Sequence, residues 1–180
     1  MGAVLKARPR PGERAQSLVE TALVLPLFLL ITFNAANFGY FFFVALNLAS
    51  APREGVEYSI QGFATPSTPN LPNAGPSTTV TSVSWLTYRD MAALHLSSNA
   101  EVRVCTKLQG VDPVSHKANC TSYGGSSTFT GPAADPEPTA FVLHRVDVKY
   151  SFTPLIPGQL FNLVVPNLTF HRQVSMRAMD

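Results

Sequence analysis

Hydrophobic side chains dominate residues 18–49, where Glu20 and Tyr40 are the only ionisable groups. The densest part, residues 22–48, would make a helix about 40 Å long at about 1.5 Å per residue, which exceeds the roughly 30 Å hydrocarbon core of a bilayer. A tilted helix of this length can span the core. The pattern therefore predicts one transmembrane helix over residues 16–49.

Three polar residues interrupt this stretch at a regular spacing. Asn34, Asn37 and Tyr40 are three residues apart, so a helix places them on one face. In lipid, polar side chains are more stable against another helix than against acyl chains. We predict that this face packs against a neighbouring helix.

After the apolar stretch the pattern changes twice before residue 100. Residues 50–62 are predicted to form a juxtamembrane helix, because Pro52 suits a first turn and Gly62 suits a helix end. Residues 63–84 are rich in Pro, Ser and Thr and are predicted to form a loop. A further helix is predicted over residues 85–96, with one apolar face formed by Trp85, Tyr88, Ala92 and Leu96.

Alternation of apolar and polar residues predicts three strands, over residues 100–108, 144–152 and 168–177. One apolar and one polar face per strand indicates an antiparallel sheet with one covered side and one side in water. The apolar sets are Val102, Val104 and Leu108; Val146, Val148, Tyr150 and Phe152; and Leu168, Phe170, Val174 and Met176. We predict that the two short helices cover this side, so that residues 85–180 form a small α+β, pilin-like head domain after the membrane helix.

The charge distribution adds an orientation to this plan. The formal net charge is only +2, but the first 15 residues hold a basic surplus, with Lys6, Arg8, Arg10 and Arg14 against Glu13. A short basic segment beside a membrane helix is typical of a cytoplasmic flank, and it is too confined for a nucleic-acid-binding patch. Residues 1–15 are therefore interpreted as a cytoplasmic leader, with the head outside the cytoplasm.

A second interpretation of the N-terminal segment remains open. Ala49, Ser50 and Ala51 resemble a signal-peptidase site, which would make the chain a secreted or membrane-tethered binding module whose first segment is only a signal anchor. The apolar stretch is much longer than the roughly 7–15 residues of a signal's hydrophobic region. Pro52 also follows the triplet directly. Both features favour the transmembrane interpretation.

Glu20 is unusual in such a helix, because a carboxylate inside a membrane helix costs roughly 2.5–3.5 kcal/mol. If the chain is cut between Ala15 and Gln16, the new α-amino group, with a pKa of about 8, is mostly charged at neutral pH. Glu20 would then be the fifth residue of the mature chain. Pairing with that amine, in the same or a neighbouring subunit, would lower the cost of both charges.

The segment ERAQSLVETALVLPLFLL, which begins at Glu13, resembles the N-terminus of TadE-like proteins, the minor pilin-like proteins of tight-adherence (Tad/Flp) pilus systems. Those proteins are similar to type IVb prepilins, with a short basic leader, a small residue and a Leu-Pro-rich membrane helix. The resemblance implies that a prepilin peptidase cuts after Ala15, which leaves Gln16 as the first residue and Glu20 as the fifth. Two positions depart from the pattern, because Ala15 replaces the usual Gly and Thr21 replaces a common aromatic residue.

The resemblance also implies a location, partners and a function. It implies a single-pass protein of the bacterial cytoplasmic membrane, with a cytoplasmic N-terminus and a periplasmic or extracellular head, which after processing either enters the pilus or remains in the membrane as a platform. The implied partners are the inner membrane, the prepilin peptidase, other pilin-like subunits and the pilus assembly machinery, and no nucleic acid. The implied function is structural, that of a minor pilin or pseudopilin in adhesion and surface attachment.

The two cysteines, Cys105 and Cys120, lack a CxxC partner and any zinc-ligand spacing. Cys105 lies on a predicted strand and Cys120 in a polar segment, 110–139, that is predicted to be a loop. In an oxidising compartment a disulfide is favoured, and closing a loop of this length would stabilise the head by about 3 kcal/mol. Two free thiols are the alternative in a reducing compartment.

Catalytic and cofactor motifs are not found in the sequence. Of the four histidines, only His144 and His171 lie on predicted strands where they could approach each other. No nucleotide-binding loop, hydrolase motif or calcium-loop spacing is present. We therefore predict no enzymatic activity, no cofactor and no metal site.

Overall fold

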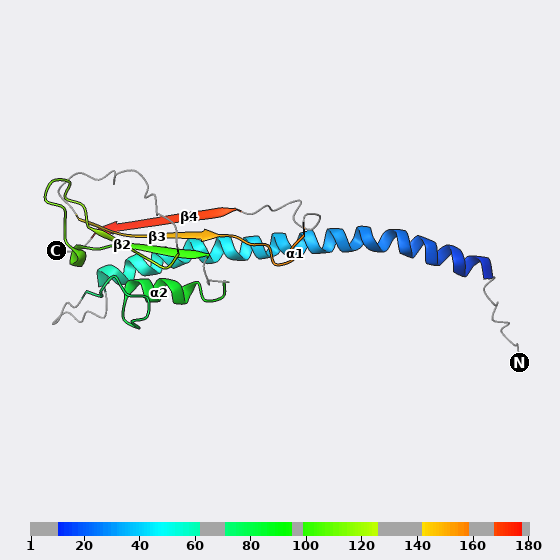
Figure 1. The fold of residues 1–180 in the computed structure, drawn as a ribbon, viewed down its shortest axis with the longest axis horizontal. Coiled ribbons are helices and arrows are strands. Elements are labelled where there is room, and N and C mark those ends of the chain that lie inside the picture. Colours follow the sequence, from blue (N-terminus) through cyan, green and yellow to red (C-terminus); the bar gives the residue numbers. More distant parts are fainter. Residues whose placement is uncertain (1–10, 62–70, 95–98, 126–141, 159–167, 178–180) are drawn as a thin grey trace, which may run out of the picture. The chain divides into compact units, whose positions relative to one another are not determined.

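The computed structural model describes residues 11–61, 71–94, 99–125, 142–158 and 168–177, with side chains from Gln16 onward. Figure 1 shows its elements, which in chain order are α1 (Pro11–Gln61), α2 (Val83–Asp90), β1 (Ala100–Cys105), the 3-10 helix η1 (Lys107–Gln109), β2 (Cys120–Tyr123), β3 (Leu143–Ser151) and β4 (Thr169–Arg177). The chain divides into two compact units, residues 1–40 with 154–166 and residues 41–153 with 167–180. Helix α1 contributes to both.

The larger unit is built on one antiparallel sheet with the strand order β2-β1-β3-β4. The predicted α+β class is therefore confirmed, with a long apolar helix ahead of a small antiparallel sheet. β3 and β4 lie within one residue of their predicted bounds. β2 falls in a segment that was expected to be a loop, because its four residues are polar or partly exposed and show no apolar alternation.

Strand β1 ends at Cys105, three residues earlier than predicted. The 3-10 helix η1 turns the chain there, and Gly110 follows with a φ of 97°, a conformation that favours glycine. Leu108, which was expected on the apolar face of the strand, is therefore 52% exposed.

The second half of α1 covers the apolar face of this sheet. Its fully buried side chains recur every three to five residues, as expected for one stripe of a helix, and are Val44, Leu48, Ala51 and Val56. The facing side of the sheet is formed by the buried valines Val102, Val104, Val146 and Val148. Gly55 allows the close approach, because a Cβ there would collide with Thr87 of α2 and touch Val146 of β3. α1 runs without a break across the predicted boundary between residues 49 and 50.

Helix α2 begins two residues earlier than predicted and ends well before residue 96. Ser82 caps it, because its hydroxyl oxygen accepts the backbone N–H of Trp85 at 3.1 Å. The buried side chains of α2 are Val83, Ser84 and Thr87, whereas Trp85 and Tyr88 are only half-buried. The predicted face with Trp85 and Tyr88 is therefore wrong, and Leu96 lies outside the described residues.

His144 is fully buried on the apolar side of β3, where it joins three elements. Its Nε2 accepts the backbone N–H of Lys107 at 3.1 Å, and its Nδ1 lies 3.1 Å from both the hydroxyl and the carbonyl of Ser59. Accepting at Nε2 and donating at Nδ1 is the pattern of a neutral imidazole. Burial lowers the pKa of His144, opposed by the Ser59 carbonyl and assisted by the charge of Lys107.

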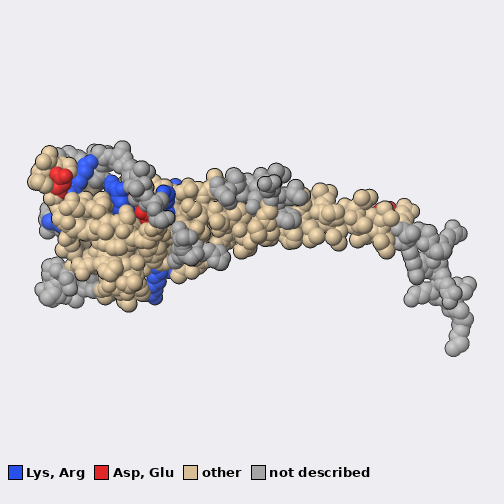
Figure 2. Space-filling view, in the orientation of Figure 1, with Lys and Arg blue, Asp and Glu red and all other residues tan. Residues whose placement is uncertain are grey.

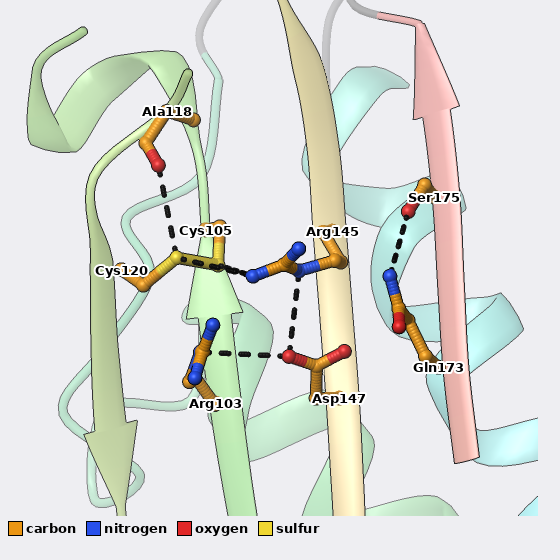
Figure 3. A network of polar contacts seen from close by, with 8 residues as sticks. All are labelled: Arg103, Cys105, Ala118, Cys120, Arg145, Asp147, Gln173 and Ser175. Carbon is orange, nitrogen blue, oxygen red and sulfur yellow. Dashed lines mark hydrogen bonds and ion pairs between the residues drawn. A yellow bond between two sulfur atoms is a disulfide. The ribbon is translucent and has the colours of Figure 1, made fainter. Parts of the chain in front are cut away.

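On the two central strands, β1 and β3, the polar face of the sheet is not open to water as predicted. Asp147 is fully buried, and Glu101 and Arg145 are 5% and 8% exposed. Asp147 forms ion pairs with two arginines, which lowers the cost of burying these charges (Figure 3). Its Oδ2 lies 3.5 Å from Arg103 Nε and 3.4 Å from Arg145 Nε. Beside them, Cys105 of β1 and Cys120 of β2 are joined by a disulfide.

Candidate functional site, the exposed half of helix α1

The N-terminal half of α1 exposes apolar side chains around its whole circumference. Leu18 and Leu23 are 71% and 72% exposed, and the same half also exposes Val19, Val24, Leu25, Leu27, Phe28, Leu29 and Ile31. In the face that Figure 2 shows, this half is almost free of charged atoms, which gather instead over the part that holds the sheet. α1 is the one helix among the described residues that is long and apolar enough to cross a membrane.

This surface does not suit water. Burying a large apolar side chain is favourable by about 1.5–3 kcal/mol, and soluble monomers rarely expose so many side by side. A helix satisfies its own backbone hydrogen bonds, so such a segment is stable in lipid. Its two threonine hydroxyls are satisfied as well, because Thr21 donates to the Ser17 carbonyl and Thr32 to the Phe28 carbonyl, both at 2.8 Å.

The predicted processing residues lie at the start of this half. Ala15 belongs to α1, but its side chain is outside the described part of the chain. Gln16 and Glu20 are one helical turn apart, and Gln16 Nε2 donates to Glu20 Oε1 at 3.2 Å. The Glu20 carboxylate is exposed and lies beside an open apolar groove lined by Thr21, Val24, Leu25 and Phe28.

The three polar residues predicted to pack against a neighbouring helix lie on the covered side of α1, with Asn34 and Asn37 only 7% and 1% exposed. Asn37 uses its amide within its own chain, because Nδ2 donates to the Ile156 carbonyl at 3.1 Å and Oδ1 accepts the Ile156 N–H at 2.9 Å. Asn34 Nδ2 donates to the Leu30 carbonyl at 2.8 Å, and Tyr40 is half-buried. Contact of this face with another helix stays a prediction.

The titratable groups of the sheet do not form a catalytic cluster in the described part of the chain. His144 and His171, the two histidines on predicted strands that could have approached each other, lie on opposite faces of the sheet, because β3 pairs His144 with Met176 and Lys149 with His171. No three His, Cys, Asp or Glu side chains among the described residues could hold a metal ion. Asp90 has a pKa raised to about 7 by burial, by a hydrogen bond with Glu54 and by the charge of that carboxylate.

Sequence reasoning also missed two arrangements that involve described residues. The pairing of Asn37 with Ile156 spans 119 positions of the chain, and no local pattern signals it. The cluster of Arg103, Arg145 and Asp147 was placed on the correct face by the alternation, but its burial was not expected.

Comparison with known proteins separates the two parts of the chain. The family model described as TadE-like protein matches residues 15–57, the exposed half of α1 and most of the half that covers the sheet. No curated protein matches the chain, and no solved structure does so. The resemblance stated from the sequence is confirmed over this range: residues 15–57 match the TadE-like family, which suggests an association with the Tad pilus.

Proposed function

We propose that this chain is a minor pilin or pseudopilin of a Tad pilus, a structural subunit that supports adhesion and surface attachment. One observation carries the proposal. A single helix with the TadE-like signature exposes apolar side chains on all sides before residue 32 and buries them against its own sheet from Val44 onward. The first half is suited to lipid and then to neighbouring subunits, whereas the second half anchors a folded head.

In this proposal the spanning segment is shorter than residues 16–49. The helix from Gln16 to Asn37 is about 33 Å long, which already fills a hydrocarbon core of about 30 Å. We propose that the bilayer ends near Asn37, with the head outside the cytoplasm. An environment-sensitive fluorophore on Leu46→Cys should then report water in vesicles, while one on Leu27→Cys reports hydrocarbon. A hydrocarbon signal at residue 46 would restore the longer span.

In this proposal a prepilin peptidase removes residues 1–15 and makes Gln16 the N-terminus of the mature helix. Helical side chains point toward the N-terminus, so Glu20 would reach back to a new amine on Gln16 one turn away. N-terminal sequencing of protein from cells that contain the peptidase should give a mature chain that starts at Gln16. A start at Met1 or Gly2 argues against processing, and a start at Pro52 supports the alternative of a secreted binding module.

Glu20 distinguishes the pilin function from a simple tether. In the proposal, Glu20→Gln and Glu20→Leu lower the amount of the chain in sheared surface filaments, because the amine loses its counter-charge. Thr32→Leu is the matched control, since it removes a polar group from the same exposed half without removing a charge. Equal recovery of all three variants in the filament fraction would favour the tethered module, which has no role for Glu20.

A further inference from the structure

The connection that follows β3 returns to helix α1 within the smaller unit of the chain. Residues 154–166 belong to the same compact unit as residues 1–40, and the described part of this segment is residues 154–158, Pro-Leu-Ile-Pro-Gly, here called the PLIPG turn. The turn meets α1 at Asn37, whose amide donates to the Ile156 carbonyl and accepts the Ile156 N–H (Figure 1). It is therefore held at the level of α1 at which we propose that the bilayer ends.

The sequence around the PLIPG turn is unusually apolar for a connection between strands. No charged residue or histidine occurs between Lys149 and His171. The large apolar residues in this stretch after β3 are Phe152, Leu155, Ile156, Leu160, Phe161, Leu163, Val164, Val165, Leu168 and Phe170. By contrast, residues 106–119, which connect β1 to β2, contain two lysines, an aspartate and a histidine. The composition of the stretch suits lipid better than water.

The PLIPG turn adds apolar surface next to the exposed half of α1. Leu155 is 54% exposed, and the neighbouring Ile156 is the residue that Asn37 binds. A single exposed leucine is ordinary on a protein surface. This leucine, however, adjoins a helix whose apolar side chains are exposed on all sides before residue 32. Because the two apolar surfaces are continuous, the same medium is expected to cover both.

The backbone of the PLIPG turn also suits a medium with little water. Irregular backbone at membrane depth is tolerated only where its polar groups find partners within the protein. Pro154 and Pro157 have no backbone N–H. The Ile156 N–H donates to Asn37 Oδ1 at 2.9 Å, and the Ile156 carbonyl accepts from the same amide at 3.1 Å. Three of the first four residues of the turn therefore present no unpaired backbone N–H.

We infer that the PLIPG turn is a second membrane contact of this chain, in which Leu155 inserts into the interfacial layer of the bilayer beside α1. The inference rests on the proposed function, because it requires the exposed half of α1 to lie in lipid. The headgroup layers widen a core of about 30 Å to about 40–45 Å. A side chain at the level of Asn37 thus reaches the acyl chains, while the backbone of the turn stays among the headgroups. Because the turn lies on one side of α1, the contact also limits rotation of the helix about its own axis.

Two leucines of nearly equal exposure provide a matched test of this contact. Leu155 is 54% exposed and Leu108, in η1, is 52% exposed. The full-length protein, with its disulfide intact, carries an environment-sensitive fluorophore on Leu155→Cys or on Leu108→Cys and is placed at one copy per phosphatidylcholine nanodisc. We expect brominated lipid to quench the label at residue 155 at least about threefold more than the label at residue 108, and aqueous iodide to show the reverse order. Equal quenching of the two labels by iodide would overturn the inference.

A label on Leu27→Cys separates this inference from the proposed function. If brominated lipid quenches residue 27 while iodide quenches residue 155, α1 spans the bilayer but the turn lies in water, and only the inference is wrong. If iodide quenches both labels, the span itself is wrong, and the proposed function fails with it. A label at residue 155 that iodide reaches in single-copy discs but not at high protein density would assign the turn to a neighbouring subunit, which would also overturn the inference.

The part played by Asn37 is tested by removing its amide. Asn37→Ala should raise iodide quenching at residue 155 about twofold or more, because the turn loses both hydrogen bonds that hold it against α1. Asn47→Ala is the matched control, since the Asn47 amide donates to the Phe43 carbonyl of its own helix. The same iodide quenching in both variants would contradict the attachment of the turn through Asn37.

Discussion

Gly39 and Gly55 both lie within helix α1, and they allow one identical substitution in two different surroundings. A Cβ at Gly39 would have no other atom within 4 Å. A Cβ at Gly55 would collide with Thr87 Oγ1 and contact both methyl groups of Val146 at 3.5 Å. We predict that Gly55→Ala destabilises the head, whereas Gly39→Ala does not.

The magnitude follows from two opposing contributions. Overfilling a packed core costs about 1–3 kcal/mol, and Thr87 cannot yield easily because it is fully buried and its hydroxyl donates to the Val83 carbonyl at 2.9 Å. Alanine in place of glycine favours a helix by about 1 kcal/mol. The free energy of unfolding should therefore fall by about 1 kcal/mol for Gly55→Ala, and it should not fall for Gly39→Ala.

A second substitution isolates the collision. Thr87→Ala removes the hydroxyl that the new methyl group meets, so the double variant Gly55→Ala, Thr87→Ala should be more stable than the sum of the single effects predicts. Residues in contact usually show coupling of about 0.5–3 kcal/mol. A coupling near zero would mean that α1 does not approach α2 at Gly55 as the structure shows.

Fluorescence of Trp85 provides the assay, because it is the only tryptophan and lies in α2. Urea unfolding of the full-length protein in micelles, followed at this residue, gives the midpoint and slope for each variant. A midpoint for Gly55→Ala at or above that of Gly39→Ala would refute the reasoning from packing.

Three further predictions concern polar contacts and the disulfide. The pKa of His144 is lowered by burial, so the folded state favours the neutral imidazole. The free energy of unfolding should therefore fall as the pH drops below about 6.5, the ordinary pKa of histidine. Urea unfolding at several pH values should show that the free energy of unfolding depends less on pH in His144→Gln than in the wild type. Replacing Cys105 and Cys120 together by serine removes a link across 15 positions and should lower the free energy of unfolding by about 3 kcal/mol, whereas an unchanged urea midpoint would contradict it. Asn37→Ala leaves a backbone N–H and carbonyl without their side-chain partners and should speed hydrogen exchange there about tenfold or more; Asn47→Ala is the matched control, because Asn47 donates only to a carbonyl of its own helix.

The sequence located those parts of the fold in which local pattern and burial agree. β3 and β4 alternate cleanly, and their observed bounds, Leu143–Ser151 and Thr169–Arg177, follow the pattern closely. The class of the N-terminal segment was also predictable, because a carboxylate at Glu20 in an apolar helix demands an explanation that few protein classes supply.

Other features depend on contacts that the sequence does not display. The start of α2 was signalled locally, since a serine three residues before Trp85 is a typical cap, but the prediction followed the helical spacing of apolar residues from Trp85 onward instead. β2 forms because its backbone completes the edge of the sheet beside β1, and its polar side chains give no sign of this. Period-two alternation assigns a residue to a face, yet it cannot tell whether the face of Asp147 is wet or buried.

The two halves of α1 contain the same kinds of residue but place them in different surroundings. Hydropathy therefore treats residues 22–48 as one membrane segment, and only the position of exposed and buried side chains divides it. Large side chains are exposed all round up to Ile31, whereas from Val44 onward one stripe is buried and Leu46, outside that stripe, is 70% exposed. Asn37 lies between the exposed part and the part with the buried stripe. Its amide forms hydrogen bonds with both backbone groups of Ile156, and such hydrogen bonds are stronger where water is scarce. A polar asparagine is unfavourable in the middle of a membrane-spanning helix, so its position at residue 37 suits the end of the span.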